Sequence, residues 1–252
     1  MSRRTPVSPD AASDTRTLNR TWEKLEAAVT SCRRCPRLVA HREQVARVKK
    51  RAFRECDYWG KPVPGFGDYE ATLLIVGLAP AAHGANRTGR MFTGDSSGDW
   101  LYEALHRHGF ANQPTSRFRG DGLTLCGTFI SAAVRCAPPD NKPLREELAN
   151  CQAFLLAEYG LMKEVRVVLT LGRVALSAFL SCREKAGCPA LRPSPVFTHG
   201  AVTRLPEGVY LLTSYHPSRQ NTQTGRLTRP MWHSVFEKAR RLVGEPGAKT
   251  EE

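Results

Sequence analysis

"TLLIVGLAPAAHGANRTGRMFTGDSSGDWL", residues 72–101, is the stretch that decides the fold class of this chain. An apolar run rich in Leu, Ile and Val stops at Gly77, and a periodic segment begins near Ser96. A strand, then a loop of small and hydrogen-bonding residues, then a helix is the order in which α/β proteins carry functional groups. The first turn of this loop, residues 77–82, has no ionisable side chain. Any acid or base at this edge must therefore come from elsewhere.

The same alternation of short apolar runs and longer helical patterns continues along the chain. It predicts strands over residues 72–76, 127–134, 166–171 and 209–214, an edge strand within 196–205, and helices over 97–108, 143–161, 172–182 and 228–243. Short apolar strands separated by helices indicate a mainly parallel sheet with helices on both faces. The segment 57–71 is broken by Pro and Gly, and we expect no regular element there.

Three unusual loops follow predicted strands, at residues 77–95, 135–142 and 215–221. The carboxyl ends of parallel strands lie at one edge of their sheet, so these loops are expected to converge on one crevice.

The N-terminal part predicts a helix over residues 18–31, in which Leu18, Trp22, Leu25 and Val29 recur at helical spacing. Residues 1–17 and 244–252 are polar, and we expect them to be disordered tails around one domain, residues 18–243. The first residues lack the apolar core of a secretory signal, and no apolar run is long enough to span a membrane.

The balance of charged residues indicates what kind of partner the protein binds. Lys and Arg number 37 against 24 Asp and Glu, which gives a net charge of +13. Such a charge favours polyanions, although a diffuse charge that only aids solubility is the alternative. Nine Lys and Arg crowd residues 33–54, and this clustering favours nucleic acid.

Eight cysteines without a signal peptide indicate a reducing compartment, where metal ligation or burial is more common than disulfides. Cys32 and Cys35 form a C-x2-C pair, and Cys136 and Cys151 follow about a hundred residues later. Four thiolates brought together would suit a 4Fe–4S cluster or a tetrahedral zinc ion. The alternative is a redox pair, or an inert pair, with two buried thiols. The other four, Cys56, Cys126, Cys182 and Cys188, are interpreted as core or surface thiols, with the last two as a weaker ligand pair.

Three motifs and the four cysteines together resemble one known family. The motifs are GLAPAAHGANRTGRMFTGDSSGDWL (77–101), VRCAPPDNKP (134–143) and YHPSRQNT (215–222). They are similar to the family 5 uracil-DNA glycosylases, the type B iron–sulfur enzymes of bacteria and archaea. The resemblance implies a three-layer α/β/α sandwich with a central, mainly parallel four-stranded sheet. It also implies a 4Fe–4S cluster, with Cys32, Cys35, Cys136 and Cys151 as its ligands.

Site roles follow from the same resemblance. His216 would donate to the O2 of the departing pyrimidine, Phe92 would stack on the flipped base, and Asn141 would read its edge. Each has an ordinary alternative: a capping or core histidine, core packing, and an Asx turn between prolines.

The chain departs from related glycosylase families mainly in lacking an acidic or amide side chain directly after the strand-end glycine, Gly77. Related glycosylase families place Asp, Glu or Asn in the two positions after the strand-end glycine, where this chain has Leu78 and Ala79. The nearest replacement is Asp95, which we expect to orient water or stabilise the positive sugar. Asp95 is also a good N-cap for the helix that follows, and this alternative stays open.

The small residues Gly77, Ala79 and Ala81 are expected to line the substrate pocket and to leave room for a purine. Backbone amides of residues 77–82 could hold the water or the base oxygens instead of Asp95. The residues Arg219, Gln220 and Asn221 are expected to contact DNA as a wedge; the alternative is a solvated polar loop.

The leading hypothesis is a monofunctional DNA glycosylase of base excision repair, acting on double-stranded DNA. Its implied substrates are uracil and other deaminated bases, including hypoxanthine, with ethenocytosine and mismatched thymine as further candidates. No lysine stands in the motifs as an obvious Schiff-base nucleophile, so no strand cleavage is expected. We expect a monomer in a prokaryotic cytoplasm, at the nucleoid. The rivals are a noncatalytic, zinc-stapled nucleic-acid-binding module and, less well supported, an iron–sulfur electron carrier.

Overall fold

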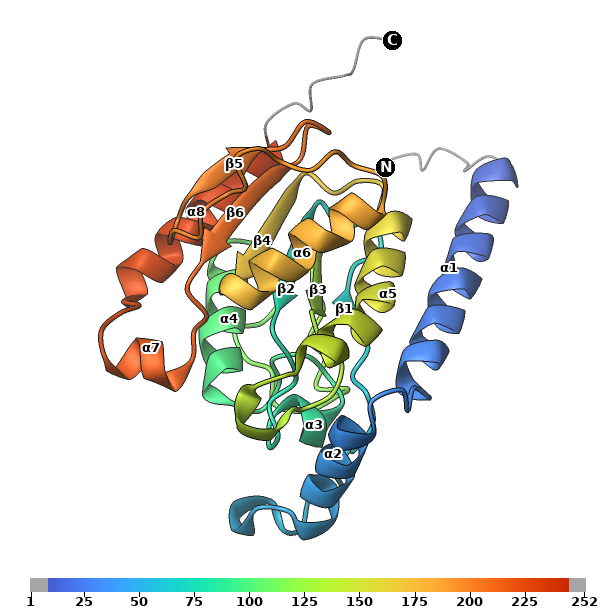
Figure 1. Ribbon diagram of the computed structural model, residues 1–252, viewed down its shortest axis with the longest axis vertical. Coiled ribbons are helices and arrows are strands. Elements are labelled where there is room, and N and C mark those ends of the chain that lie inside the picture. Colours follow the sequence, from blue (N-terminus) through green and yellow to red (C-terminus); the bar gives the residue numbers. More distant parts are fainter. Residues whose placement is uncertain (1–8, 245–252) are drawn as a thin grey trace, which may run out of the picture.

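The computed structural model describes residues 9–244 of the 252-residue chain (Figure 1). Its helices are α1 (Pro9–Thr30), α2 (Pro36–Val48), α3 (Ala85–Thr88), α4 (Ser96–Arg107), α5 (Arg145–Leu161), α6 (Arg173–Lys185), α7 (Arg219–Gln223) and α8 (Arg229–Gly244). Its strands are β1 (Phe66–Gly67), β2 (Leu73–Gly77), β3 (Thr128–Ala132), β4 (Val167–Leu171), β5 (Val202–Arg204) and β6 (Tyr210–Ser214). Two 3-10 turns, η1 (Arg51–Phe53) and η2 (Pro139–Asn141), complete the set.

The sheet has six strands in the order β1-β3-β2-β4-β6-β5. The four central strands are mutually parallel, as expected, because their apolar runs are buried on both faces. The expectation of four strands is corrected by the two antiparallel edges. β1 lies within residues 57–71, where we expected no regular element, and it pairs with β3. β5 covers only three residues of the edge strand expected within 196–205.

Alternating side chains of the central strands divide the core into two layers, as the α/β/α sandwich requires. Leu73 and Ile75 of β2 pack in the cluster that contains the buried faces of α4 and α8. Leu74 and Val76 pack on the other face with α5, α6 and Trp22 of α1. Figure 1 shows α5 and α6 in front of the sheet, with α4 and α8 behind it.

The N-terminal helix begins at Pro9, earlier than expected, so residues 9–17 belong to α1 rather than to a tail. The expected tails otherwise fall on residues 1–8 and 245–252, which lie outside the described residues. Trp22 and Val29 are buried as the helical spacing predicts. Within the described residues, none of the helices combines the length and the apolar character that crossing a membrane requires.

Candidate active site at the carboxyl edge of the sheet

The three loops singled out in the sequence follow β2, β3 and β6, whose carboxyl ends lie at one edge of the sheet. Ladder pairing continues past the strands there, because Ala133 N–H donates to Gly77 O and Val134 N–H to Leu78 O, each at 3.0 Å. This pairing holds the first turn of the β2 loop against the loop that leaves β3. In Figure 1, α3 and α7 lie at this end of the molecule.

Phe92 and His216 face each other at this edge. Their rings are stacked with centroids 5.6 Å apart and an angle of 28° between the planes. Phe92 adopts a left-handed backbone conformation (φ 53°) that a bulky residue rarely takes. A Cβ on Gly77 would lie 2.9 Å from the Phe92 ring, so this glycine is required for the ring to lie there. The expected stacking platform and the expected histidine are therefore neighbours.

The His216 imidazole is a neutral group. Burial lowers the pKa of His216 to about 4, because the interior disfavours the charged ring. Its position depends on the loop beyond it, since Asn221 Nδ2 donates to His216 O at 2.9 Å. A neutral imidazole offers one N–H donor and one acceptor, so it can bind a carbonyl oxygen without bringing a positive charge into the pocket.

Asp95 caps α4, which was the alternative interpretation of this residue. Its Oδ1 accepts from the N–H groups of Ser97 and Gly98, both at 3.0 Å. Its Oδ2 lies over Gly84, where an added Cβ would come within 1.9 Å of it. Desolvation raises the pKa of Asp95, and the two capping bonds oppose that rise. One carboxylate oxygen is thus committed to the helix, while the other lies within the β2 loop.

The other predicted site residues are more dispersed. Asn141 ends η2 on the surface with a φ of 56°, and its N–H donates to Pro138 O. Ala81 O accepts from the N–H groups of Gly84 and Asn86, which closes the first turn of the β2 loop. Ala79 packs instead against the cysteine cluster described below.

The expected DNA-contacting residues form the short helix α7 rather than an open loop. Arg219 Nε donates to Ser96 Oγ at 3.3 Å, which joins α7 to the first turn of α4. Gln220 is exposed, whereas the Asn221 side chain is bonded to the His216 backbone. Asn221 therefore holds the backbone of His216 in place.

The four predicted ligand cysteines come together from three parts of the chain, and we call them the cysteine corner. Cys32 and Cys35 lie between α1 and α2, Cys136 follows β3, and Cys151 lies on α5. All four line one small cavity, together with apolar neighbours such as Leu38 and Phe154. Among residues 9–244, no three His, Cys, Asp or Glu side chains converge closely enough to hold a single metal ion.

Hydrogen-bond donors point at three of these sulfurs. Arg42 Nη1 is 2.9 Å from Cys136 Sγ, Arg135 N is 3.4 Å from Cys151 Sγ, and Asn150 Nδ2 is 3.6 Å from Cys35 Sγ. The Arg42 side chain is 2% exposed and its Nε has no partner among the described residues. A buried cation beside sulfur fits an anionic, sulfur-ligated group in this cavity.

Burial raises the pKa of Cys136, against the opposing effect of Arg42, and raises the pKa of Cys151 to about 12. Bare thiols would therefore stay protonated here, and a metal is what would hold them as thiolates. Of the remaining cysteines, Cys182 is buried and Cys126 is exposed, in line with core and surface thiols.

Two contacts near the site had no signal in the sequence. Tyr58 Oη is 3.0 Å from His83 Nδ1, so the tyrosine fixes a histidine of the β2 loop. Asn86 Nδ2 donates to Arg42 O at 3.2 Å, which joins the β2 loop to the cysteine corner. Arg42 and Asn86 are 44 positions apart, one in the basic segment and one in the motif at residues 77–101, and nothing in the sequence pairs them.

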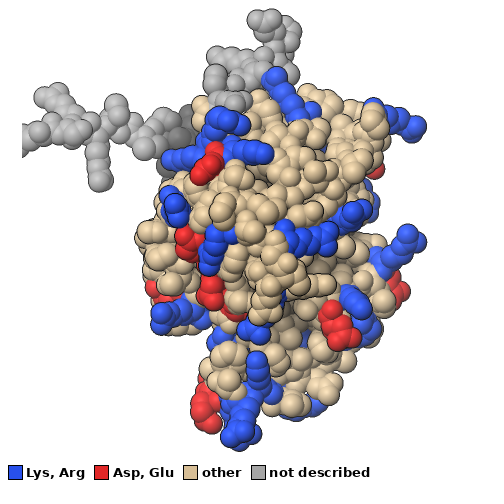
Figure 2. Space-filling model, turned by 90° about the vertical axis from the view of Figure 1, so that its left-hand side faces the viewer, with Lys and Arg blue, Asp and Glu red and all other residues tan. Residues whose placement is uncertain are grey.

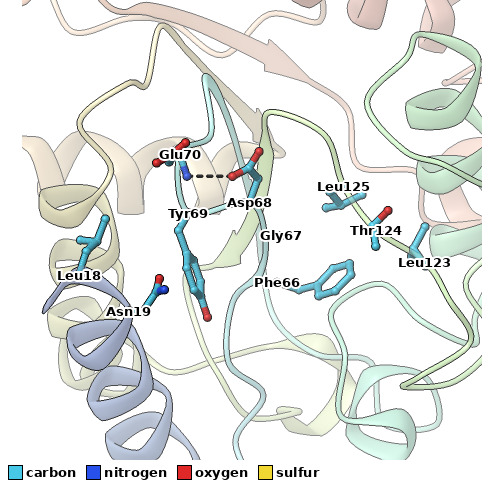
Figure 3. Close-up of a pocket in the computed structure, with 10 residues that line it drawn as sticks. All are labelled: Leu18, Asn19, Phe66, Gly67, Asp68, Tyr69, Glu70, Leu123, Thr124 and Leu125. Carbon is cyan, nitrogen blue, oxygen red and sulfur yellow. Dashed lines mark hydrogen bonds between the residues drawn. The ribbon is translucent and has the colours of Figure 1, made fainter. Parts of the chain in front are cut away.

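A larger cavity of about 460 Å³ lies among α1, β1 and the segment before β3 (Figure 3). It is at the amino edge of the central strands, since Asp68 N–H donates to the O of Thr128, the first residue of β3. The Asp68 carboxylate accepts from the N–H groups of Glu70 and Gly127, so its role there is structural. The loops with functional groups lie at the opposite edge.

The surface is rich in cations. Figure 2, which shows the side of the molecule with α7 and α8, has Lys and Arg spread over the face with fewer Asp and Glu between them. The charge is not confined to the basic N-terminal segment.

The sequence is also similar to those of known proteins. The model of the family described as the uracil DNA glycosylase superfamily matches residues 64–240. A protein of Thermus thermophilus named "Type-5 uracil-DNA glycosylase" is 54% identical over 222 residues, which are 88% of this chain and 98% of that protein. A Mycobacterium tuberculosis protein of the same name is 51% identical over 88% of this chain and 81% of that protein. A third, from Pyrobaculum aerophilum, is 42% identical over 84% of this chain and 88% of that protein.

Proposed function

Because the chain belongs to the uracil DNA glycosylase superfamily, and within it to the type-5 enzymes, we propose that it removes uracil from DNA as a monofunctional glycosylase. It is a hydrolase of N-glycosyl bonds. The reaction breaks the bond between the base and C1′ of the sugar, adds the oxygen of water to C1′ and releases the free base. The developing charges are positive on the sugar and negative on the base.

The stacked pair Phe92 and His216 over Gly77 is the observation that carries the proposal. An aromatic face and a hydrogen-bond donor that meet at the carboxyl edge provide what a flipped base requires, a stacking surface and a polar contact at its edge. Both come from motifs that the sequence singled out, and the glycine beneath them has room for nothing larger.

His216 would act on the leaving base. A ring whose pKa is about 4 is neutral at pH 7, so its N–H would donate to the base oxygen that becomes negative as the bond breaks. A neutral donor strengthens its hydrogen bond as that charge develops, without repelling the positive sugar.

Asp95 would act on the sugar side. Its Oδ1 is held by the two capping bonds, which fixes the carboxylate and leaves Oδ2 over Gly84. We propose that Oδ2 orients the attacking water or stabilises the positive sugar, in place of the acid that is missing after Gly77.

A wider choice of bases follows from the small residues of the first turn. Ala81 presents only a methyl group in this turn, whereas the Phe92 ring occupies the place beside Gly77, and Asn141 offers an amide on the surface at the same edge. We propose that hypoxanthine is released as well as uracil, with ethenocytosine and mismatched thymine as further substrates. Double-stranded DNA is the proposed partner, bound by a single copy of the chain through its basic surface.

The cysteine corner would hold a 4Fe–4S cluster, with Cys32, Cys35, Cys136 and Cys151 as ligands. The donors on three of the sulfurs support an anionic sulfur-ligated group. Metal analysis separates this proposal from the zinc-stapled alternative, because a cluster would give iron and acid-labile sulfide whereas the alternative would give one zinc ion. The cluster would tie the basic N-terminal helices to the sandwich.

Base release decides the proposal. Duplexes that carry uracil, hypoxanthine, ethenocytosine or a thymine mismatch are incubated with the wild-type protein, and the free base is measured by chromatography. Release of uracil with an intact strand until alkali is added supports a monofunctional glycosylase. No release of any base, or strand cleavage without alkali, contradicts it.

A further inference from the structure

A hairpin between α4 and β3 projects beside the candidate active site. Its two arms are held by an antiparallel bridge between Ala111 and Leu125 and by the bond from Asn112 N–H to Thr124 O. We call residues 116–121, with the sequence SRFRGD, the hairpin tip. Nothing in the candidate active site uses the exposed side chains of this tip.

The hairpin tip is fixed by a buried ion pair. Arg90 Nη2 lies 2.8 Å from Asp121, and the two side chains are only 4% and 7% exposed. The same carboxylate accepts from the N–H groups of Arg117 and Leu123, and these bonds and the Arg90 pair lower the pKa of Asp121 against desolvation. A buried carboxylate with this many donors holds the backbone of the tip in one conformation.

The tip is bonded to the loop that carries Phe92. Gly94 N–H donates to Ser116 O at 3.1 Å, and the hydroxyls of Thr93 and Ser116 are 2.6 Å apart. Arg90 belongs to the same loop, two positions before Phe92. The hairpin tip and the stacking residue are therefore parts of one hydrogen-bonded unit.

The outer side of the tip displays an aromatic ring between two cations. Phe118 is 57% exposed, and it is the aromatic member of the exposed large hydrophobic residues in the described part of the chain. Arg117 and Arg119 are exposed on either side of it. The guanidinium of Arg119 lies 5.0 Å from the centre of the Trp59 ring, a cation–π contact that joins the tip to the segment before β1.

We propose that the hairpin tip is a second DNA-contacting element, in which Phe118 stacks on a base beside the flipped nucleotide and the two arginines bind phosphates. This inference rests on the proposed function. An exposed aromatic side chain on a rigid backbone loses little conformational freedom on binding, and every base offers a face for stacking.

The positive charge of the hairpin tip favours DNA over another protein as its binding partner. Asp121 is the acidic residue of the tip, and it is committed to Arg90, so the charges that face outward are positive. The chain as a whole carries +13. The phosphate backbone of a duplex bound at Phe92 would pass close to the tip, because the tip is bonded to the Phe92 loop.

The test measures DNA binding by fluorescence anisotropy. The probe is a duplex with a tetrahydrofuran abasic-site analogue, which resembles the product and cannot react. Phe118→Ala should weaken binding about tenfold, whereas Phe118→Trp should bind about as tightly as wild type. Arg117→Gln should reduce the slope of log K against log salt by about one. Val202→Ala is the control, because Val202 is also an exposed large side chain but lies on β5, at the far edge of the sheet.

Each outcome has one meaning. Binding by Phe118→Ala that matches wild type, or that weakens no more than Val202→Ala, overturns the inference. Uracil release by the wild-type protein reports separately on the proposed function. Release with unchanged Phe118→Ala binding removes only the hairpin inference. Weakened Phe118→Ala binding without release of any base removes only the proposed function.

Discussion

The cysteine corner and the pocket around Phe92, two neighbouring regions at the carboxyl edge of the sheet, differ in the polar groups that they present. The cysteine corner receives donors: Arg42 on Cys136, the Arg135 amide on Cys151 and the Asn150 amide on Cys35. The pocket around Phe92 has an aromatic wall, a histidine kept neutral and a carboxylate tied to a helix. The difference teaches that the corner suits negative charge alone, whereas the pocket would accommodate a positive sugar and a negative base. The cysteine corner presents hydrogen-bond donors to a group that would always be negative. In the pocket around Phe92, charge would develop only while the N-glycosidic bond breaks.

Removing a sulfur from the corner is expected to have the largest effect. Cys136→Ser should abolish iron and acid-labile sulfide in the purified protein. It should also lower the free energy of unfolding by about 1–3 kcal/mol, because the buried Arg42 would lose its 2.9 Å bond to sulfur while keeping its bonds to Cys32 O. Metal analysis and denaturant unfolding measure the two effects. Cys126→Ser is the control, because Cys126 is exposed. Full iron content in Cys136→Ser would show that the corner is not the cluster site.

Removing the neutral donor from the pocket should affect chemistry and leave binding unchanged. His216→Ala is expected to slow single-turnover uracil release by about 10²–10³-fold, since a donor to the leaving base would be lost. Affinity for the abasic-site duplex should stay close to that of wild type. His106→Ala is the control, because His106 is exposed on α4. An equal loss in both variants would contradict a specific role for His216.

Substitutions of Asp95 distinguish the role of its negative charge in the reaction from its role as the N-cap of α4. Asparagine caps helices about as well as aspartate, so Asp95→Asn should retain the stability, whereas Asp95→Ala should lose about 1 kcal/mol. If Oδ2 acts on water or on the sugar, both variants should slow base release by about 100-fold. Normal rates in Asp95→Asn would leave Asp95 as a cap, with backbone groups to position the water.

The smallest expected effect is that of pH on the pocket. Burial lowers the pKa of His216 to about 4, so single-turnover rates should change less than about twofold between pH 8 and 6. The unfolded ring titrates near 6.5, so the unfolded state binds more protons than the folded state between pH 6.5 and 4. The contribution of His216 to stability is therefore lost as pH falls through this window. A rate that halves near pH 6.5 would mean that the folded ring titrates normally.

The sequence predicted the central sheet because its strands are continuous apolar runs between turn signals. It could not predict β1, because the two residues Phe66 and Gly67 carry no periodicity and depend on β3 for pairing. The short length of β5 was missed for the same reason. An edge strand ends where its neighbour stops offering partners, and its own residues do not mark that point.

The candidate site shows a similar division. Motifs located Phe92, His216 and Asp95, and their proximity to the edge followed from parallel topology. The contact between the Phe92 and His216 rings and the position of Asp95 Oδ2 over Gly84 depend on residues that are not adjacent in the sequence. Arg42 was missed because arginines in a basic helix look alike in sequence, and burial against a sulfur far along the chain distinguishes this one.

The separation between Arg42 and Cys136 has a consequence for how the protein is made. The two residues are 94 positions apart, so α2 and the first cysteine pair leave the ribosome long before their partners exist. At ordinary elongation rates that interval is about 5–20 s. During it the two thiols and the arginine are solvated, and contacts of such high sequence separation close late in folding. The cysteine corner can therefore close only after β3 and α5 have been synthesised.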